Sequence, residues 1–289
     1  MHTDTTAMRF SGQVVIVTGA ASGIGQELCR LLARRGARIG LVDRNKSELD
    51  AFAEELRQTG NMCAAVAADV RQRDDVHDAV DQIVGTLGSP DILIASAGIC
   101  RASTVHDLRI SDVEEIIGAN FLGMVYAIEA ILPAMLARRS GQIVGISSMA
   151  GLRGIPFEPA YSASKAAMAV YLESLRSELR PLEIGVTTVF PGYVQTPLLA
   201  EINGMMGSDM SSGRASTKEA AAAKIMRAIE RRNSYAYFPR RLALSARLSH
   251  FMPPRMYDRV MRRMFSRFSI SRRGGPNVGD PSEGPTANP

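Results

Sequence analysis

The chain has 289 residues, 46% of them hydrophobic, and a formal net charge of +5. This length suits one large α/β domain or two small ones, with enough apolar residues for a substantial core. The three cysteines, Cys29, Cys63 and Cys100, lack metal or redox spacing, so we expect a reduced, cytoplasmic setting. We expect no secretory signal in Met1–Arg9 and no run as long as a transmembrane helix.

The positive charge is concentrated towards the C-terminus. From Lys224 to Arg273, fourteen Lys and Arg stand against two acids, Glu230 and Asp258, a local balance of +12. Since the whole chain carries +5, the remainder carries −7. This asymmetry indicates a basic surface for anionic lipid, an acidic partner or nucleic acid. We expect no nucleic acid, because no aromatic residues interleave with a basic surface.

The first elements favour dinucleotide binding. Gln13–Thr18 is typical of a buried strand, Gln26–Arg35 has a helical period, and between them Gly19-Ala-Ala-Ser-Gly23-Ile-Gly25 forms a turn. Such glycines let the backbone approach a pyrophosphate, and the N-terminus of the helix favours its charge. The spacing differs from the usual fingerprint, so a plain glycine-rich turn is the alternative.

The second predicted strand, Ala37–Val42, ends at Asp43. A carboxylate about 20 residues past the glycine turn can bind the adenosine ribose and repel a 2′-phosphate. It could instead cap the next predicted helix, Lys46–Thr59. Because Arg44 would suit a 2′-phosphate, the pattern favours NAD and leaves NADP open.

Strands and helices alternate along the rest of the chain. The further predicted strands are Met62–Ala68, Asp91–Ala95, Gly141–Ile146, Gly185–Phe190 and Ser234–Phe238. The further predicted helices are Arg73–Leu87, Ser111–Arg138, Ala160–Arg180 and Thr217–Arg231. This pattern predicts a Rossmann-type, doubly wound parallel sheet of about seven strands with helices on both faces. Ligands of such sheets bind beyond the carboxyl ends of the strands.

Tyr161 and Lys165 lie four residues apart, about one turn apart on one face of a predicted helix. An ammonium close to a phenol should lower its pKa from the usual value of about 10. A phenol tuned towards neutrality can exchange a proton with an alcohol or an alkoxide. Together with Ser147-Ser148 upstream, this segment is a candidate proton-transfer centre.

Two other segments carry expectations. In Ser111–Arg138, Asn120 is expected on the buried side, and Pro133 is expected to kink or break the helix. Leu198–Ser216 is rich in Gly, Ser and Met and is expected to be a mobile loop. Its methionines, Met205, Met206 and Met210, would form an adaptable cover over a substrate, or belong to a poorly ordered insertion.

The C-terminal region differs from the rest. Arg255–Phe268 carries apolar residues on one stripe and arginines on another, as a basic amphipathic helix. It would lie on a membrane surface, or pack on its own domain or a sister subunit. We expect a flexible N-terminus over 1–9, a catalytic domain over 10–240, a basic helical extension over 241–273 and a disordered tail over 274–289.

These motifs, in this order, resemble the short-chain dehydrogenase/reductase family in its single-domain form. The matching pieces are Thr18-Gly-Ala-Ala-Ser-Gly-Ile-Gly25, Asp69-Val70, Ser96-Ala97-Gly98, Asn120, Ile146-Ser-Ser148, Tyr161-x3-Lys165 and Pro191-Gly192 through Thr196. They cover about residues 10 to 240. The family more often has Asn where this chain has Ser96.

The resemblance implies a role for each matching residue. Ser148 orients the substrate oxygen, Tyr161 is the general acid/base, Lys165 assists it and holds the nicotinamide ribose, and Asn120 anchors a water. The implied cofactor-binding residues are Gly19, Ser22, Gly23, Ile24, Gly25, Asp43, Arg44, Asp69, Val70, Ala97, Gly98, Tyr161, Lys165, Pro191, Gly192, Val194 and Thr196. No metal is implied.

We therefore expect an NAD(P)-dependent oxidoreductase that interconverts an alcohol and a ketone or aldehyde. The Met, Leu and Phe content of Leu198–Met210 and of the C-terminal helix suggests a steroid, terpenoid or fatty-acyl substrate. The alternatives are an NADPH-dependent 3-oxoacyl thioester reductase and a non-catalytic dinucleotide sensor. By resemblance, the chain would form a homodimer or homotetramer through its two long helices, and the basic helix would allow peripheral membrane contact.

Overall fold

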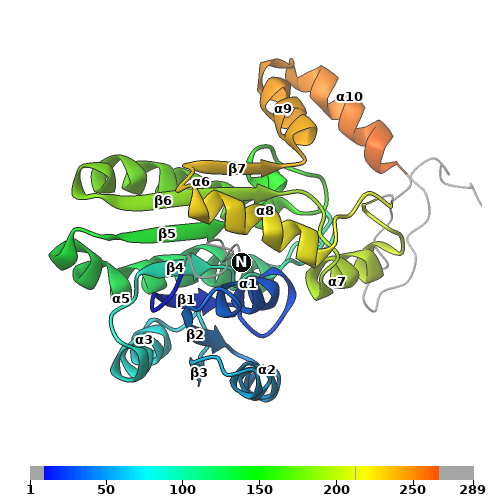
Figure 1. Cartoon of the computed structure of the whole chain (residues 1–289). Helices are drawn as coiled ribbons and strands as arrows, with labels where there is room; N and C mark the ends of the chain where they lie inside the picture. Colours follow the sequence, from blue (N-terminus) through cyan, green and yellow to red (C-terminus); the bar gives the residue numbers. More distant parts are fainter. Residues whose placement is uncertain (1–9, 212, 267–289) are drawn as a thin grey trace, which may run out of the picture.

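The computed structural model describes residues 10–211 and 213–266, in which seven parallel strands form one sheet (Figure 1). The strands are β1 (Val14–Thr18), β2 (Arg38–Asp43), β3 (Cys63–Ala67), β4 (Ile92–Ala95), β5 (Gly141–Ile146), β6 (Ile184–Pro191) and β7 (Tyr235–Phe238). Their order is β3-β2-β1-β4-β5-β6-β7, so the winding direction reverses between β1 and β4. The predicted doubly wound parallel sheet is confirmed.

Helices cover both faces of the sheet. The helices on one face are α1 (Gly23–Ala33), α2 (Lys46–Gln58) and α8 (Lys218–Glu230), and those on the other are α3 (Arg73–Leu87), α5 (Gly123–Arg138) and α6 (Pro159–Leu179). Strand β1 shows why both faces need cover. Val15 and Val17 join the first core, Val14 and Ile16 the second, and all are fully buried. An apolar run of this kind is typical of a parallel strand buried on both sides.

The long helical segment before β5 is interrupted at Gly118–Leu122 and not at Pro133, where a kink or break was expected. It consists of α4 (Ile110–Ile117), a π-helical turn (Gly118–Leu122) and α5. Pro133 lies inside α5, so the prediction of a break there was wrong. Packing holds the helix together, because Ile128, Ile131 and Met135 around Pro133 are buried. Asn120 lies in the π turn and is fully buried, as expected from its neighbours.

The expectation about membrane-length segments also needs correction. Ile110–Arg138 spans 29 residues and is apolar enough, by length and composition alone, to cross a membrane. Its most apolar window is 44% buried, and α5 contributes to the same core as α3 and α6. A core helix meets the same criterion, so this segment gives only weak grounds for a membrane span.

The segment after β6 contains a helix, α7 (Pro197–Met206), where a mobile loop was predicted. The Thr196 hydroxyl caps it by accepting a hydrogen bond from the Leu199 N–H at 3.4 Å. Pro197 occupies its first turn, and Gly207 ends it with a φ of +64°. These are ordinary start and stop signals of a helix. The many Gly, Ser and Met residues around them concealed the pattern.

Two helices follow β7 and stand beside its edge of the sheet (Figure 1). They are α9 (Arg240–Leu248) and α10 (Pro254–Phe265), with a 3₁₀ turn, Ser249–Phe251, between them. The extension is helical over its described part, although the pattern predicted only the second helix. The predictions for 1–9 and 267–289, which include the end of the basic helix and the disordered tail, lie outside the described residues.

Candidate active site

A cavity of about 600 Å³ lies at the carboxyl ends of the strands. The loops after β1 to β6 line it, together with parts of α7, α9 and α10. Every predicted catalytic or cofactor-binding residue lines this cavity except Gly25 and Asn120. The fold therefore brings together residues that are up to 177 positions apart in the sequence, from Gly19 to Thr196. Their individual roles remain predictions.

The glycine turn has room for a pyrophosphate because side chains are excluded from it. A Cβ on Gly19, whose φ is +67°, would lie 2.8 Å from the Ala97 Cα. A Cβ on Gly25 would lie 2.1 Å from the Gly19 carbonyl oxygen, so Gly25 lets α1 approach the turn without lining the cavity. Ser22 precedes α1 and makes no capping bond with its side chain. The N-terminus of α1 thus fits an anionic group.

Asp43 is held at the end of β2 by backbone donors. Its carboxylate accepts hydrogen bonds from the Ala21 N–H at 3.0 Å and from the Asn45 N–H at 3.0 Å. The alternative role, capping of α2, falls to Asn45, whose side chain accepts from the Glu48 N–H at 3.3 Å. Asp43 lines the cavity beside Arg44 and is suited to bind ribose hydroxyls.

The loop after β3 forms the part of the cavity wall next to Asp43. Asp69 forms an ion pair with Arg71, whose Nη2 lies 2.6 Å from Oδ2. Hydrogen bonding to this guanidinium lowers the pKa of Asp69, so its carboxylate stays ionised. Val70 is buried against Gly123, where an added Cβ would come within 2.9 Å of the Val70 side chain. Helix α5 therefore fixes the loop that carries Asp69 and Val70, which the family resemblance assigns to the adenine.

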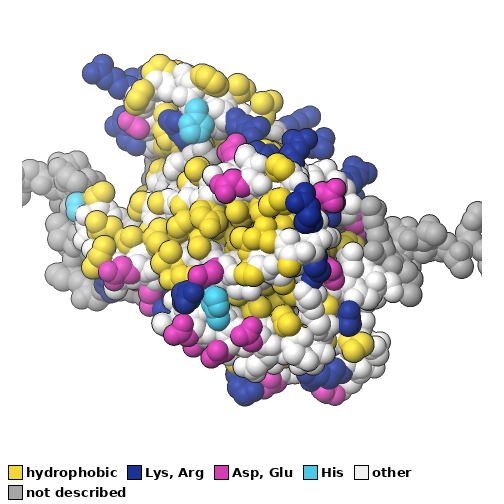
Figure 2. Space-filling model, turned by 90° about the vertical axis from the view of Figure 1, so that its left-hand side faces the viewer, with side chains coloured by type: hydrophobic (Ala, Val, Ile, Leu, Met, Phe, Trp, Pro, Cys, Tyr) yellow, Lys and Arg dark blue, Asp and Glu magenta, His cyan; other side chains and the backbone are white. Residues whose placement is uncertain are grey.

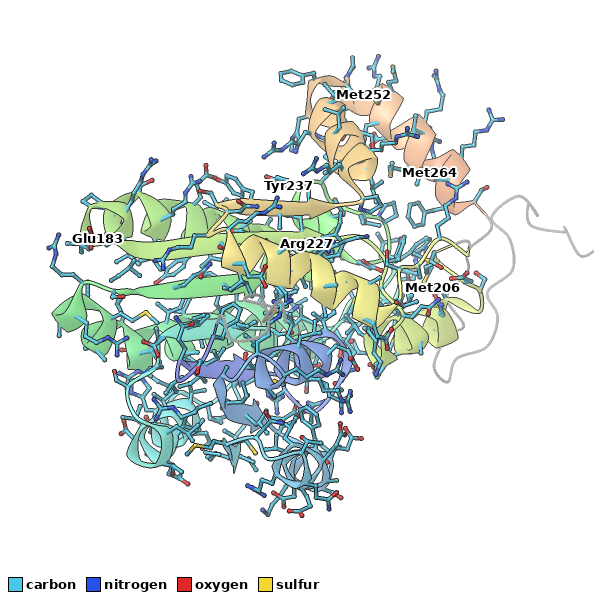
Figure 3. The ribbon with its side chains drawn as sticks, in the orientation of Figure 1. Glu183, Met206, Arg227, Tyr237, Met252 and Met264 are labelled. Atoms are coloured by element: carbon cyan, nitrogen blue, oxygen red, sulfur yellow. The ribbon has the colours of Figure 1, made fainter. Side chains whose placement is uncertain are left out.

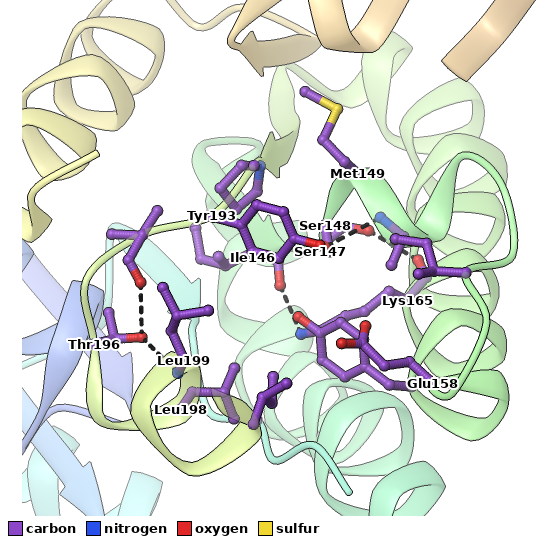
Figure 4. Close-up of a pocket in the computed structure, with 18 of the residues that line it drawn as sticks. Ile146, Ser147, Ser148, Met149, Glu158, Lys165, Tyr193, Thr196, Leu198 and Leu199 are labelled. Atoms are coloured by element: carbon purple, nitrogen blue, oxygen red, sulfur yellow. Dashed lines mark hydrogen bonds between the residues drawn. The ribbon is translucent and has the colours of Figure 1, made fainter. Parts of the chain in front are cut away.

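Ser148, Tyr161 and Lys165 line the cavity, and Figure 4 labels Ser148 and Lys165. The Lys165 Nζ donates to the Ile146 carbonyl at 2.8 Å and lies 5.8 Å from the centre of the Tyr161 ring. The Ser148 hydroxyl accepts from the Ala150 N–H at 3.2 Å and hydrogen-bonds the Tyr161 side chain. A hydroxyl, a phenol and an ammonium thus meet in one place, as the motif predicts.

The protonation of this centre is governed by burial. Burial raises the pKa of the Tyr161 phenol, while the Ser148 hydrogen bond acts in the opposite direction. Burial also lowers the pKa of Lys165 from 10.5 to about 8. The prediction that Lys165 holds the pKa of Tyr161 below its usual value is wrong for this structure. The loss of water around the phenol is the largest effect.

Asn120 supports the centre from behind. Its side chain accepts from the Ile99 N–H at 2.7 Å and donates to the Ile99 carbonyl at 3.0 Å and to the Ser164 Oγ at 2.9 Å. The Ser164 hydroxyl donates in turn to the Tyr161 carbonyl at 2.7 Å. Ser147, which the motif did not assign, donates from Oγ to the Lys165 carbonyl at 2.9 Å. These bonds fix the backbone of α6 at Tyr161 and Lys165.

The segment after β6 forms the wall expected to hold the carboxamide. The Gly192 N–H donates to the Phe238 carbonyl at 2.8 Å, and Val194 pairs with Ser216 in a parallel bridge. The Thr196 hydroxyl donates to the Val194 carbonyl at 3.2 Å (Figure 4). This wall is therefore fixed by its own backbone.

The substrate end of the cavity contains residues that sequence reasoning missed. They are Glu158, Tyr193, Leu242, Ala246 and Met252, together with Met149 and Ile155. The expected methionine cover was wrong, because Leu198, Leu199 and Ile202 line the cavity from α7 instead. Met206 and Met210 are buried in the apolar cluster around Tyr161. Glu158 could have been found from the sequence, because it is the one acid in the otherwise apolar run from Ile155 to Ala160.

Helix α10 packs on its own domain, which was one of the two alternatives for the basic helix. Phe265 is buried, and the Tyr257 hydroxyl donates to the Gly154 carbonyl at 2.7 Å. The Arg153 guanidinium lies 4.2 Å from the centre of the Tyr257 ring. Met264, labelled on α10 in Figure 3, lines the cavity yet remains 55% exposed. Packing therefore uses only part of the apolar stripe.

Comparison with known proteins identifies the family. Residues 13–207, more than half of the chain, match the family model described as short chain dehydrogenase. The chain belongs to the short-chain dehydrogenase family. This membership confirms the predicted resemblance, the enzyme class, an oxidoreductase acting on CH–OH groups, and the class of cofactor, NAD or NADP. Within the described residues, no group of three or more His, Cys, Asp or Glu could hold a metal ion.

Individual relatives and structures agree with this family. An uncharacterized oxidoreductase of Myxococcus xanthus is 33% identical over 88% of this chain and 98% of its own length. An 11-beta-hydroxysteroid dehydrogenase-like protein 4A of Arabidopsis thaliana is 41% identical over 65% of this chain and 62% of its own length. A short-chain dehydrogenase/reductase of Burkholderia phymatum, solved in complex with NAD, has a TM-score of 0.77 at 24% identity and covers 84% of this chain and 94% of its own.

Proposed function

We propose that this short-chain dehydrogenase oxidises an apolar secondary alcohol to a ketone, or a primary alcohol to an aldehyde, and catalyses the reverse reduction. The convergence of Ser148, Tyr161 and Lys165 in a cavity with an apolar far wall carries this proposal. A sensor that only binds a dinucleotide would have no use for this combination of groups. The proposal thus favours catalysis over sensing.

The residues around the reacting oxygen act on its proton. Bound NAD supplies the hydride acceptor, and its reduced form supplies the donor. Ser148 hydrogen-bonds the substrate oxygen and keeps it in reach of Tyr161. The Tyr161 hydroxyl then exchanges the alcohol proton, and Lys165, one helical turn further along α6, holds the nicotinamide ribose. Holding these groups in place supplies much of the rate enhancement.

NAD is the proposed cofactor, with NADP as the alternative. The carboxylate of Asp43 at the end of β2 supports NAD, because it accepts ribose hydroxyls and repels a 2′-phosphate. Arg44 beside it would favour NADP. A titration with NADH and NADPH, followed by the change in the fluorescence of the reduced nicotinamide on binding, tests the choice. Tighter binding of NADPH would contradict our assignment of Asp43.

An apolar substrate is proposed because the cavity continues under two helices. Leu242 and Ala246 of α9 and Met261 and Phe265 of α10 line its far end. The similarity to a protein named for hydroxysteroid dehydrogenases is consistent with a steroid, terpenoid or fatty-acyl skeleton. Reduction of a panel of ketones, followed by NADH oxidation, tests this. Activity confined to small hydrophilic sugars would contradict it.

A 3-oxoacyl thioester reductase is the second candidate, favoured by the basic surface of the two helices that line the far end of the cavity. Arg240, Arg241, Arg255 and Arg259 are exposed on α9 and α10, where an acidic carrier protein could dock. This enzyme would prefer NADPH and require the thioester carrier. Turnover of an acyl-carrier substrate far above that of free ketones would favour it.

The exposed face of the C-terminal helices supports contact with an anionic membrane surface. Leu244, Leu248 and Phe251 are 60%, 58% and 87% exposed. Hydrophobic side chains and arginines both face solvent at the top of Figure 2, where these helices lie. Apolar residues inserted at the headgroups, with arginines attracted to anionic lipid, are the features of an interfacial helix. We thus propose a cytoplasmic enzyme that visits membranes for its substrate.

Phe251→Glu tests the membrane contact without touching the cavity, because Phe251 does not line it. The control is Val105→Glu, which changes a residue that is 90% exposed on another loop. We expect the first variant to lose co-sedimentation with phosphatidylserine vesicles and the second to keep it. Equal sedimentation of both variants would remove this part of the proposal.

A homodimer or homotetramer is expected through the outer sides of α5 and α6. Leu136 and Val170, on these helices, are 40% and 67% exposed. Pairing of these helices with those of a second copy would remove both apolar side chains from water. Light scattering of the purified protein gives the mass of the assembly, and a monomer at micromolar concentration would contradict the expectation.

A further inference from the structure

Glu158 is a buried acid in the cavity that the catalytic motif does not explain. It directly precedes α6 and stands three residues before Tyr161 (Figure 4). Its side chain is 4% exposed, and its Oε1 is a buried oxygen with no hydrogen-bond partner. Burying a carboxylate without a hydrogen-bond partner costs folding free energy, so a function is needed to explain its presence here.

A structural role does not account for it. The residue that precedes a helix usually caps it by accepting a hydrogen bond from the first turn. Glu158 makes no such bond with its side chain, and no ion pair to it is found among the described residues. The carboxyl group therefore does not stabilise the start of α6.

The surroundings point into the cavity. Glu158, Tyr161 and Tyr193 line the same cavity, so the carboxyl group shares a chamber with the Tyr161 phenol. Apolar side chains line the cavity near it, with Ile155 and Ile202 among them, and the polar groups there include Arg153, Tyr193 and Tyr257. In ligand sites of this kind, a few polar groups in an apolar wall set the orientation of the ligand.

The chemistry of the group indicates its ligand. Burial raises the pKa of Glu158 from 4.5 to about 7, so near neutral pH it is present both as a hydrogen-bond acceptor and as a donor. A substrate hydroxyl can hydrogen-bond the carboxyl group in either protonation state, because a hydroxyl both donates and accepts. A purely apolar molecule would leave the buried oxygen unpaired and would bind less well.

We propose that Glu158 forms a second polar subsite, which takes a hydroxyl group that the apolar substrate carries away from its reacting carbon. The substrate class is thus a hydroxylated ketone or a diol on an apolar skeleton. This inference rests on the proposed oxidoreduction of apolar substrates and names a polar feature of that substrate. Glu158 acts here as a specificity-determining residue and takes no part in proton transfer.

Matched ketones that differ by one hydroxyl test the subsite. The first pair is androstanone and hydroxyandrostanone, and the second is methyl decyl ketone and its terminally hydroxylated analogue. We expect the wild-type protein to favour the hydroxylated member of at least one pair by about tenfold or more in kcat/KM, as one hydrogen bond to a buried carboxyl implies. Glu158→Leu should abolish that preference, and Glu158→Gln, whose amide still bonds a hydroxyl, should keep part of it.

The controls separate this subsite from general damage. Glu201→Gln changes an acid of α7 that pairs with Arg101 and does not line the cavity, and its preference should equal that of the wild type. NADH binding by Glu158→Leu should be unchanged. Equal kcat/KM for both members of each pair in the wild type, or an equal loss for both in Glu158→Leu, would overturn the subsite alone. Failure to reduce any of the four ketones would overturn the apolar substrate itself.

Discussion

The two ends of the cavity are built in different ways. The cofactor end consists of strand ends, glycines and backbone hydrogen bonds, so its shape depends on where side chains are absent. The substrate end consists of side chains from α7, α9 and α10 and from the loop before α6, which carries the unpartnered carboxyl oxygen of Glu158. The first end suits a ligand shared by a family, while the second can change without disturbing the sheet. This comparison teaches that shared chemistry and individual specificity are encoded by different parts of the chain.

The largest expected effect comes where the two ends meet. Tyr161→Phe removes only the hydroxyl, so we expect kcat to fall by about 10²- to 10⁴-fold, the usual contribution of a general acid/base. NADH binding should persist. Tyr171→Phe is the matched control, because Tyr171 lies on the same helix and packs edge-on against Phe121 outside the cavity. Undiminished turnover by Tyr161→Phe would return the chain to the class of sensors.

The next largest effect concerns the stability of the protein, which the buried carboxyl of Glu158 should make dependent on pH. A carboxyl whose pKa is raised from 4.5 to about 7 in the folded protein costs no stability below about pH 4.5, where both states are protonated. The cost grows as the pH rises to about 7, because only the unfolded chain has then released the proton, and it is complete above that pH. We expect Glu158→Gln to be more stable than the wild type at pH 8 by up to about 3 kcal/mol.

Denaturant unfolding at several pH values measures this difference. It should shrink towards pH 4.5, where the neutral carboxyl and the amide are alike. Glu114→Gln, on the exposed side of α4, controls for the loss of one negative charge. A difference between Glu158→Gln and the wild type that does not vary with pH would mean that the Glu158 carboxyl is not desolvated.

At the cofactor end, one added methyl group should lower the stability of the protein and weaken NAD binding. Gly25→Ala places a Cβ 2.1 Å from the Gly19 carbonyl oxygen, and relief of such overpacking typically costs about 1–3 kcal/mol. We expect a lower free energy of unfolding and weaker NAD binding. Gly85→Ala is the control, because a Cβ there meets no atom within 4 Å and helix α3 should gain slightly. Equal behaviour of the two variants would contradict a backbone-defined turn.

The smallest effect concerns the choice between cofactors. Asp43→Asn removes the charge that repels a 2′-phosphate but keeps an oxygen for the Ala21 N–H. We expect the preference for NAD over NADP to fall by about tenfold. The control is Asp50→Asn, which lies exposed on α2. An unchanged ratio of the two dissociation constants would assign the choice to Arg44 or another group.

The cofactor end of the cavity could be predicted from the sequence better than the substrate end. The seven strands, the glycine turn and the convergence of Ser148, Tyr161 and Lys165 are predictable, because they depend on local apolar runs and fixed spacings. Helix α7 and the contacts of α9 are not, because they depend on packing between distant segments. The pKa of Tyr161 was predicted with the wrong direction, since spacing along a helix reports a nearby charge but not the loss of water.

A crystal structure of the protein with NAD tests the central claim most directly, because that claim concerns where one ligand lies. We predict the adenosine ribose at Asp43, the pyrophosphate at the glycine turn between Gly19 and Gly25, and the nicotinamide between Thr196 and the Tyr161 hydroxyl. The space beneath α9 and α10 should stay open for the substrate. Density for the dinucleotide elsewhere, or a nicotinamide out of reach of Tyr161, would contradict the account.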